Sequence, residues 1–398
     1  MQKKKVLVCL INFLIASLLG LALRYSFVGS IPINYRFLTH AHSHVAMLGW
    51  IYLMLFTLFV HYFVPGKKTV FNRLFWLTEF SVLGMMLSFP FQGYGAISIS
   101  FSTLHIFCSY YFTYLIWKHH EIKNIPARYL LKASLLFMLL STVGVWCLGP
   151  AVSLQGNASA FYQIAIQFFL HFQFQGWYLT AVLALFFYSI KLKDSENFRL
   201  FYKLLIASTL LTLALPVNWY APSKLLYWIN VIGVLIQLYS IVLFFKIVKP
   251  DLNTRFKQNS QLSNLLLAFA VFSLVLKAML QLTSLSPVFS QSSHQYRNLV
   301  IGFIHLTMLG LVSGFLFYFI VRSKIILENR FLKAGIYCFV IGFIGSEFLL
   351  MMQGSMFYFG SGSIPNYYLF LFGFSGLIPI AIIILISNIL KRKTAESS

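Results

Sequence analysis

The sequence predicts an all-α polytopic membrane protein with twelve transmembrane helices. Hydrophobic residues make up 59% of its 398 residues and charged residues only 10%, whereas soluble domains carry about 25% charge. Apolar runs of about twenty residues recur along the chain, and each is long enough to cross a bilayer of roughly 30 Å. This composition excludes a soluble globular protein, and the abundance of Phe, Leu and Ile excludes a disordered one.

The apolar runs give the expected helices in chain order. These spans are about 6–27, 38–64, 72–91, 94–117, 129–150, 160–190, 200–219, 225–248, 262–285, 297–321, 331–353 and 365–390. The first run has no small-residue cleavage site, so we expect a retained helix and not a secretion signal. The four cysteines lie singly within spans, without a CxxCH motif, and predict neither a disulfide framework nor covalently attached haem.

The net charge of +22 reports topology and not a nucleic-acid partner. If the N-terminus is cytoplasmic, the inner segments hold 25 of the 30 basic residues. Only Arg24, Arg36, Lys224 and Arg297 lie outside, and Lys277 lies within a span. Since cytoplasmic loops are enriched in Lys and Arg, this bias predicts that both termini are cytoplasmic.

An internal repeat divides the predicted single membrane domain, 1–398, into units of about 1–120, 121–250 and 251–398. Three segments share Tyr, then Arg or Gln, seven residues, His, four residues and Gly: YRFLTHAHSHVAMLGW, YQIAIQFFLHFQFQGW and YRNLVIGFIHLTMLGL. Their histidines are His44, His171 and His305, and four spans fit between each pair. The second, sixth and tenth helices are therefore expected to be equivalent members of three four-helix units.

The repeat histidines are the main candidates for chemistry. Each lies about 10–15 Å below the expected outer surface, at 1.5 Å per residue, where an ionisable group is costly and usually functional or paired. A single buried His is most simply a hydrogen-bonded packing residue. Three at one depth favour a shared ligand-binding role.

The second span is the richest in histidine, with His40, His42 and His44. Residues i and i+4 share a helix face, whereas i and i+2 point apart. His42 and His44 should therefore address different surroundings. No Cys, Asp or Glu joins the cluster, which disfavours structural zinc. Two imidazoles in an apolar, aromatic sheath suit haem b, and His42 and His171 are candidates for a second metal or haem.

Arg36 and Arg297 precede their histidines by eight residues, about two turns toward the outside. Guanidinium groups bind carboxylates in a bidentate manner, so both are candidates to bind haem propionates. Anchoring of the two side chains at the membrane interface is the alternative.

Taken together, these residues resemble subunit I of the haem–copper oxidases. HAHSHVAMLGW, from His40 to Trp50, is most similar to the haem-ligand segment of the C-type oxidase and nitric oxide reductase branch. In that family twelve helices form three units, and a low-spin haem is held between the second and tenth helices. The resemblance implies that His44 and His305 are its axial ligands, in an oxidoreductase that acts on oxygen or nitric oxide.

The chain departs from the family at the copper site. Position 303 is Phe where the family has a second histidine, and 201–220 contains no His. His171 matches a single copper ligand, with Gln175 where some members have Tyr. We therefore expect bound haem without a complete copper centre, and the resemblance does not establish catalysis.

Three other ionisable residues are expected well within spans: Glu79, Lys277 and Glu347. They can serve a proton pathway, or Lys277 and Glu347 can form a compensating ion pair.

Two other functions remain open: a haem- or copper-dependent nitric oxide response membrane protein of the NnrS kind, and a transporter that uses its intramembrane histidines. Inverted repeats are common in transporters, whereas these units share one orientation. The expected location is the bacterial cytoplasmic membrane. The expected partners are the lipid bilayer and electron-donating or accessory membrane subunits, and nucleic acid is not expected.

Overall fold

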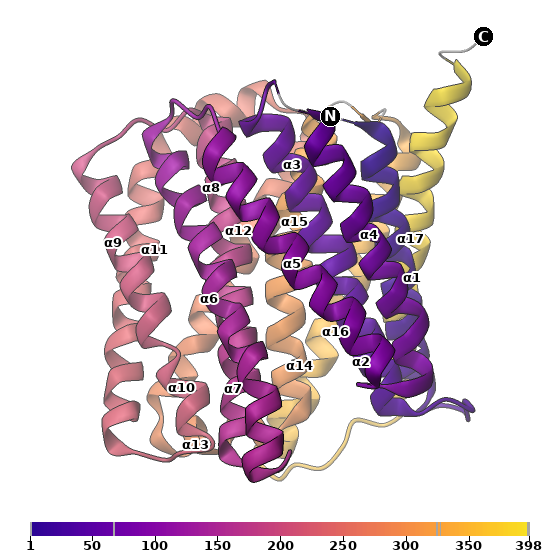
Figure 1. Ribbon diagram of the computed structural model, residues 1–398, viewed down its shortest axis with the longest axis vertical. Coiled ribbons are helices and arrows are strands. Elements are labelled where there is room, and N and C mark those ends of the chain that lie inside the picture. The colour runs from indigo at the N-terminus through magenta and orange to yellow at the C-terminus, as the bar shows by residue number, and fades with distance from the viewer. Residues whose placement is uncertain (1, 67, 324, 327, 396–398) are drawn as a thin grey trace. The chain divides into compact units, whose positions relative to one another are not determined.

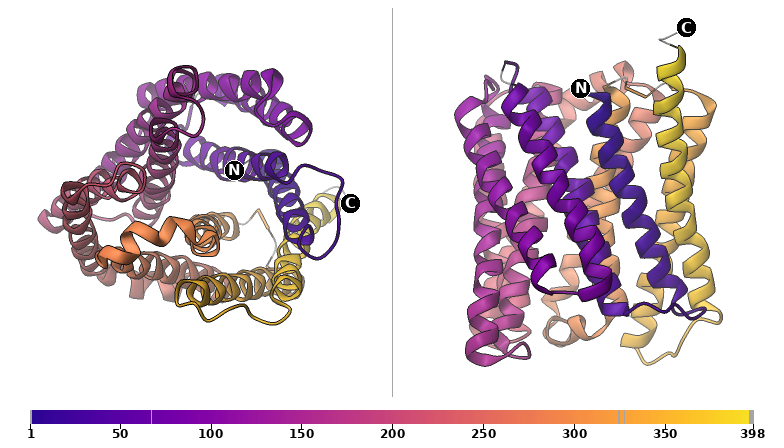
Figure 2. Two further views of the ribbon diagram at one scale, coloured as in Figure 1. Left: turned by 90° about the horizontal axis from the view of Figure 1, so that it is seen from below. Right: turned by 45° about the vertical axis from the view of Figure 1, so that its right-hand side comes forward.

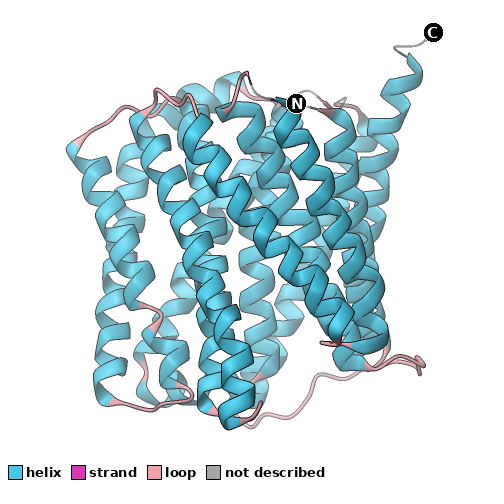
Figure 3. Ribbon diagram, in the orientation of Figure 1, coloured by secondary structure: helices cyan, strands magenta, loops and turns pink. Residues whose placement is uncertain are grey.

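The computed structural model describes residues 2–66, 68–323, 325–326 and 328–395 of the chain. Helices joined by short loops make up this part, and no strand occurs in it (Figure 3). The expectation of an all-α chain is confirmed. The helices cluster into two compact units, one of 1–121 with 316–398 and the other of 122–315.

The first unit combines the helices of the two ends of the chain (Figure 1). Its elements are α1 (Lys3–Tyr25), α2 (Tyr35–His44), η1 (Val45–Tyr52), α3 (Leu53–Phe63), α4 (Lys68–Gln92), α5 (Ala96–His119), most of α15 (Ser313–Arg322), α16 (Arg330–Tyr358) and α17 (Tyr367–Ala395). The start of α1 and the end of α17 lie at the same end of this unit (Figure 2).

The second unit contains the central part of the chain. Its elements are α6 (Ile125–Gln155), α7 (Ala160–His171), η2 (Phe172–Tyr178), α8 (Leu179–Ile190), α9 (Glu196–Leu211), α10 (Ala214–Asn218), α11 (Lys224–Gln258), α12 (Gln261–Gln281), η3 (Leu282–Leu285), α13 (Pro287–Ser292), η4 (Ser293–Gln295), α14 (Arg297–His305) and η5 (Leu306–Val312). α6 packs along α7, η2 and α8, and α9 packs along α11.

Ten of the described helices are long and apolar enough to cross a membrane, so the chain is a multi-pass membrane protein. The other two expected spans coincide with α5 and with the rod formed by α7, η2 and α8. Neither of these is among the ten, and the count of twelve spans stays a prediction. The three-unit repeat also stays a prediction.

Many of the helices begin where a short polar side chain caps them. The side chain at the N-cap accepts a hydrogen bond from a backbone N–H of the first turn and so satisfies one of the donors that a helix start leaves open. The caps are Asn34, Asn124, Ser159, Ser195, Ser260, Ser286 and Asn329.

Aromatic side chains fill the interior of each unit. In the first, Phe13 of α1 stacks on Trp50 of η1 with ring centroids 4.7 Å apart, and Phe56 of α3 stacks on Phe112 of α5 at 4.3 Å. In the second, Phe187 of α8 stacks on Phe244 of α11 at 6.0 Å. The Phe-rich composition thus supplies the packing between helices as well as the lipid-facing surface.

Three π-helical segments interrupt the long rods, and each begins directly after a repeat histidine. η1 follows His44, η2 follows His171 and η5 follows His305. Each also contains the repeat glycine: Gly49, Gly176 or Gly310. Long π segments are rare, and short ones are frequent at functional sites. The shared motif therefore coincides with a shared backbone irregularity.

A side chain satisfies a backbone carbonyl in each π segment. Asn12 Nδ2 donates to the Gly49 carbonyl at 3.2 Å. The Thr180 hydroxyl donates to the Gly176 carbonyl, and the Ser313 hydroxyl donates to the Met308 carbonyl at 2.8 Å. Because lipid offers no replacement donor, these bonds make the wider turns tolerable in a membrane span.

Burial changes sharply at each repeat histidine. Before it, α2 buries two residues and α7 and α14 bury one each. After it, η2 buries all seven of its residues, and η1 and η5 each bury all but one. The segments that follow, α3 and α8, are almost entirely buried. Each repeat histidine thus lies at the boundary between a more exposed helical segment before it and a buried segment after it.

Gly144 and Gly149 of α6 allow a matched test of the packing in the second unit. A Cβ on Gly144 would meet the Ala165 carbonyl and the Phe169 amide of α7, whereas a Cβ on Gly149 would meet nothing within 4 Å. We expect Gly144→Ala to lower stability by about 1–3 kcal/mol and Gly149→Ala to change it by less than about 0.5 kcal/mol. Thermal unfolding of the detergent-solubilised variants measures both, and equal effects would contradict the α6–α7 contact.

Candidate functional site

His44 is the last residue of α2, and its ring is fixed by the preceding turn. Its Nδ1 donates to the His40 carbonyl at 2.9 Å. Because a neutral imidazole has one donor and one acceptor, this bond leaves Nε2 as the acceptor. Metal-binding histidines are usually oriented in this way, by a hydrogen bond from the nitrogen that does not bind the metal.

Two aromatic rings of the first unit flank His44. The centroid of Phe89, on α4, lies 4.3 Å from that of the imidazole, and the centroid of Tyr94 lies 5.8 Å away. The His44 side chain is half-buried despite its depth in the span. The site is therefore apolar and aromatic, with Nε2 as its available lone pair.

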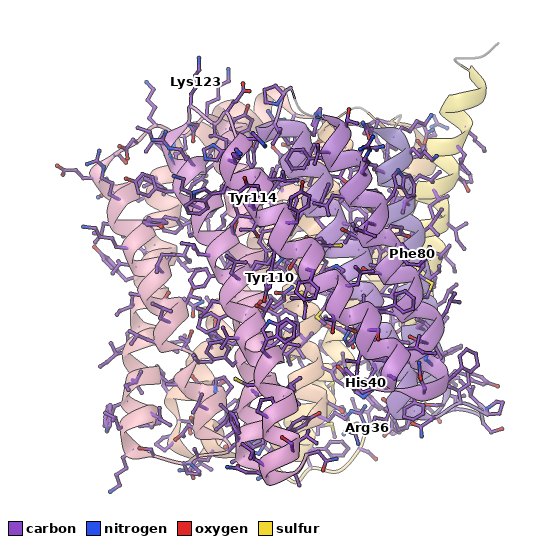
Figure 4. The ribbon with its side chains drawn as sticks, in the orientation of Figure 1. Arg36, His40, Phe80, Tyr110, Tyr114 and Lys123 are labelled. Carbon is purple, nitrogen blue, oxygen red and sulfur yellow. The ribbon has the colours of Figure 1, made fainter. Side chains whose placement is uncertain are left out.

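His40 lies one turn from His44, with its ring 4.6 Å from that of Tyr94 and 6.2 Å from that of Phe89. Arg36 is one turn further toward the start of α2 (Figure 4), is exposed, and is an electrostatic neighbour of His40. The rings of His40, His44, Phe89 and Tyr94 form one cluster. Arg36 lies at the exposed end of this cluster.

His42 contacts a different helix, as its spacing from His44 predicts. Its Nδ1 donates to the Ala16 carbonyl of α1 at 2.8 Å. The ring lies against Gly20, where an added Cβ would come within 2.8 Å of the imidazole Cε1. His42 is thus packed between two helices, and its geometry is that of a helix-packing residue.

In the second unit, His171 donates from Nε2 to the Thr209 carbonyl of α9 at 2.7 Å. This leaves Nδ1 as the acceptor, the reverse of His44. Lys277 of α12 is an electrostatic neighbour of His171 and is fully buried. Its Nζ donates to Gln281 Oε1 at 2.9 Å and lies 5.7 Å from the centre of the Phe303 ring. His171 therefore lies in a part of the second unit that also buries the Lys277 side chain.

His305 is the last residue of α14 and is half-buried directly before η5. Arg297, the first residue of α14, is exposed. The two are related along their helix as Arg36 and His44 are along α2.

His105 of α5 is a neighbour of His44 that the sequence did not single out. It is 4% exposed, and its ring centroid lies 4.7 Å from that of Tyr52 in an edge-to-face arrangement. His105 and His44 are electrostatic neighbours. The His105 Nε2 has no hydrogen-bond partner among the described residues. Because His105 is an isolated His in an apolar run, the sequence alone does not predict that it lies near His44.

The buried carboxyl of Glu79 is held by a hydrogen bond and not by an ion pair. Asn12 Nδ2 donates to Glu79 Oε2 at 2.8 Å. Glu347 of α16, also buried, has Arg24 as an electrostatic neighbour. In the described part of the chain, the one salt bridge found joins Arg199 and Asp194.

The atoms that these side chains offer as ligands determine which metal or cofactor they can bind. A search of the described residues finds no group of three or more His, Cys, Asp or Glu placed to hold a metal ion. Single oriented imidazoles in aromatic surroundings suit axial ligation of haem, whose remaining iron ligands come from the porphyrin. The comparisons with known proteins give no family: no protein-family model matches the chain, and no curated protein matches it.

We predict that His105→Leu leaves stability unchanged or raises it by about 1–3 kcal/mol. The change removes a buried nitrogen without a protein partner, whose burial costs free energy of this size. Ser141→Leu is the matched control in the other unit, since it removes a buried hydroxyl that donates to Gln173 at 3.0 Å; it should destabilise. Thermal unfolding in detergent measures both. A clear loss of stability in the His105 variant would show that its Nε2 binds a group that stabilises the fold.

Proposed function

We propose that the chain is a haem-binding protein of the bacterial cytoplasmic membrane that transfers electrons or acts on oxygen or nitric oxide. It would be a divergent relative of subunit I of the haem–copper oxidases. The carrying observation is His44, whose Nδ1 bond to the His40 carbonyl leaves Nε2 as the acceptor beside Phe89 and Tyr94. An oriented imidazole, an aromatic surrounding and partial accessibility together fit one face of a haem.

The three π segments support the same proposal. They begin directly after His44, His171 and His305, where the accessible outer part of each rod ends. A π turn changes the direction of the side chains on either side of it, and such turns cluster at functional sites. Three of them at equivalent histidines favour the repeated-unit architecture and a ligand role for at least some of these residues.

In this proposal His44 and His305 would hold haem b, and His305 is included because of the resemblance alone. The bound haem would supply one-electron redox chemistry at the iron. The chain's own residues have separate tasks. His40 holds the His44 ring through its carbonyl, Phe89 and Tyr94 limit the access of water, and Arg36 and Arg297 are placed for carboxylate binding.

A second metal centre of the family type has less support. His42 donates from Nδ1 to Ala16 and packs on Gly20, and His171 donates from Nε2 to Thr209. Both rings have helix-packing partners that account for their positions. With Phe at position 303 and no His in 201–220, the residues favour haem-based electron transfer over a complete haem–copper reaction.

The decisive test is the optical spectrum of the purified protein and of two variants. We expect the wild type to carry haem with a six-coordinate, low-spin spectrum. His44→Ala should abolish that spectrum because it removes an axial ligand. His42→Ala should retain it, since His42 contacts α1 and not the His44 surroundings.

Haem content from the pyridine haemochrome assay and the elution profile in size-exclusion chromatography separate loss of ligand from loss of fold. A folded, haem-free wild type would refute the proposal and leave transport as the stronger function. A normal low-spin spectrum in His44→Ala would refute the assignment of the ligand.

The orientation is a further part of the proposal, with both termini in the cytoplasm, and rests on the bias in basic residues. Alkaline phosphatase fused after Ser361, in the loop between α16 and α17, should be active because that loop faces the periplasm. A fusion after Ala395, at the end of α17, should be inactive, and a green fluorescent protein fusion there should fluoresce. The opposite pattern would invert the topology.

A further inference from the structure

Glu79 lies about halfway along α4 and is 5% exposed. Its carboxyl accepts a hydrogen bond of 2.8 Å from Asn12 Nδ2 of α1, which is 1% exposed. An ionised carboxylate in an apolar interior is expensive unless it is paired and well hydrogen-bonded. A single amide donor is much less than a carboxylate usually has, whereas a protonated carboxylic acid needs no counter-charge.

Asn12 connects this carboxyl to the π segment. The same Nδ2 also donates to the Gly49 carbonyl of η1 at 3.2 Å. Gly49 fits because it has no side chain: an added Cβ would lie 2.9 Å from Val82 and 3.0 Å from the Asn12 Cβ. Glu79, Asn12 and η1 are therefore in direct, close contact.

The π segment leads from this contact to His44. Gly49 is five residues after His44, and π-helical hydrogen bonds join residues five apart. On α4, Phe89 contacts the His44 ring and lies ten residues beyond Glu79. This corresponds to about 15 Å along the helix. Measured along either η1 or α4, the Glu79 carboxyl therefore lies deeper in the buried part of the unit than the His44 ring.

The titratable groups nearest to Glu79 come from α1. Cys9 is an electrostatic neighbour of the carboxyl and is fully buried. Lys5, one turn earlier, places its Nζ 5.0 Å from the centre of the Phe75 ring on α4. Lys5, Cys9 and Asn12 share a face of α1, and this face forms a line of polar atoms from the start of α1 to Glu79.

The other elements packed on α4 bring their ionisable groups elsewhere. Cys108 of α5 is buried, and His105 lies against Tyr52 of η1. The α2 histidines contact Phe89, Tyr94 or Ala16. On α3 the ionisable side chains are those of His61 and Tyr62, at the end away from η1. None of these is a cation placed against the Glu79 carboxyl.

We propose that Glu79 is a proton-binding site that holds a proton at neutral pH and exchanges it with water at the start of α1. In addition, resting on the proposed haem function, the proton is bound more tightly when the His44 site gains an electron. Glu79–H becomes Glu79 carboxylate plus one proton as the pH rises; at a pH where the oxidised protein has lost this proton, one electron from a one-electron reductant is accompanied by the return of one proton to the carboxylate. The proton offsets the added negative charge in the apolar interior.

The test is infrared spectroscopy of the full chain at neutral pH. The spectrum of the wild type minus that of Glu79→Gln should contain the carbonyl stretch of a protonated carboxylic acid. This band should shift in D₂O. Glu347→Gln is the matched control, because Glu347 is the other buried glutamate of the same unit, and the Glu79 band must persist in it.

A labelling experiment avoids the Glu79 substitution altogether. In Glu347→Gln protein labelled with ¹³C-glutamate, Glu79 is the only glutamate left deep within a span, and the band should move with the label. Carboxylate bands alone, or a band that ignores label and D₂O, would overturn the proton-binding site.

The redox part has its own readout. If haem is bound, the reduction equilibrium of the wild type should change with pH by up to tenfold per unit, or 59 mV for one electron. Glu79→Gln should lose most of this dependence and Glu347→Gln should keep it. An equal dependence in Glu79→Gln would refute the coupling. A haem-free protein would refute the proposed function, while the infrared band would still decide whether Glu79 binds a proton.

Discussion

The structure depends on one constraint: within a membrane, the chain itself must satisfy its backbone N–H and C=O groups. Long α-helices meet this constraint automatically, which is why helices account for so much of the described chain. The π segments relax it at three places, and side chains compensate in each. Asn12 bonds to Gly49, Thr180 to Gly176 and Ser313 to Met308. The backbone irregularity and the polar residues in the spans are therefore parts of one arrangement.

This arrangement explains why the histidine sites can form where they do. Ahead of each repeat histidine the rod is accessible, and beyond it the rod is closed by aromatic and aliphatic packing such as that of Trp50 on Phe13. A wider turn at that junction lets the closed half keep its packing while the histidine faces another direction. His42 and His44 both lie in α2, before the wider turn, and their contacts with α1 and α4 follow from the α-helical spacing of two residues.

Much of this was predictable because hydrophobicity and helical period are local. Ten spans, the helical class and the opposite directions of His42 and His44 follow from the order of the residues. The π segments could not be predicted in this way. In an almost entirely apolar stretch such as Val45–Tyr52, the residue pattern is the same whether the backbone is α-helical or has about one extra residue per turn. The contact of His105 with Tyr52 and the bond of Asn12 to Glu79 also depend on how separate helices rotate toward each other, which the pattern within one helix does not record.

The two units treat their buried charges differently, and this bears on function. In the first, the Glu79 carboxyl accepts a hydrogen bond from an amide that also donates to the π segment. In the second, the buried Lys277 bonds to the amide of Gln281, beside His171. Neutral amides as partners leave each ionisable group able to change its charge, whereas an ion pair would fix both charges. Both units thus place a buried ionisable side chain beside a neutral amide, and neither Glu79 nor Lys277 has an ion-pair partner among the described residues.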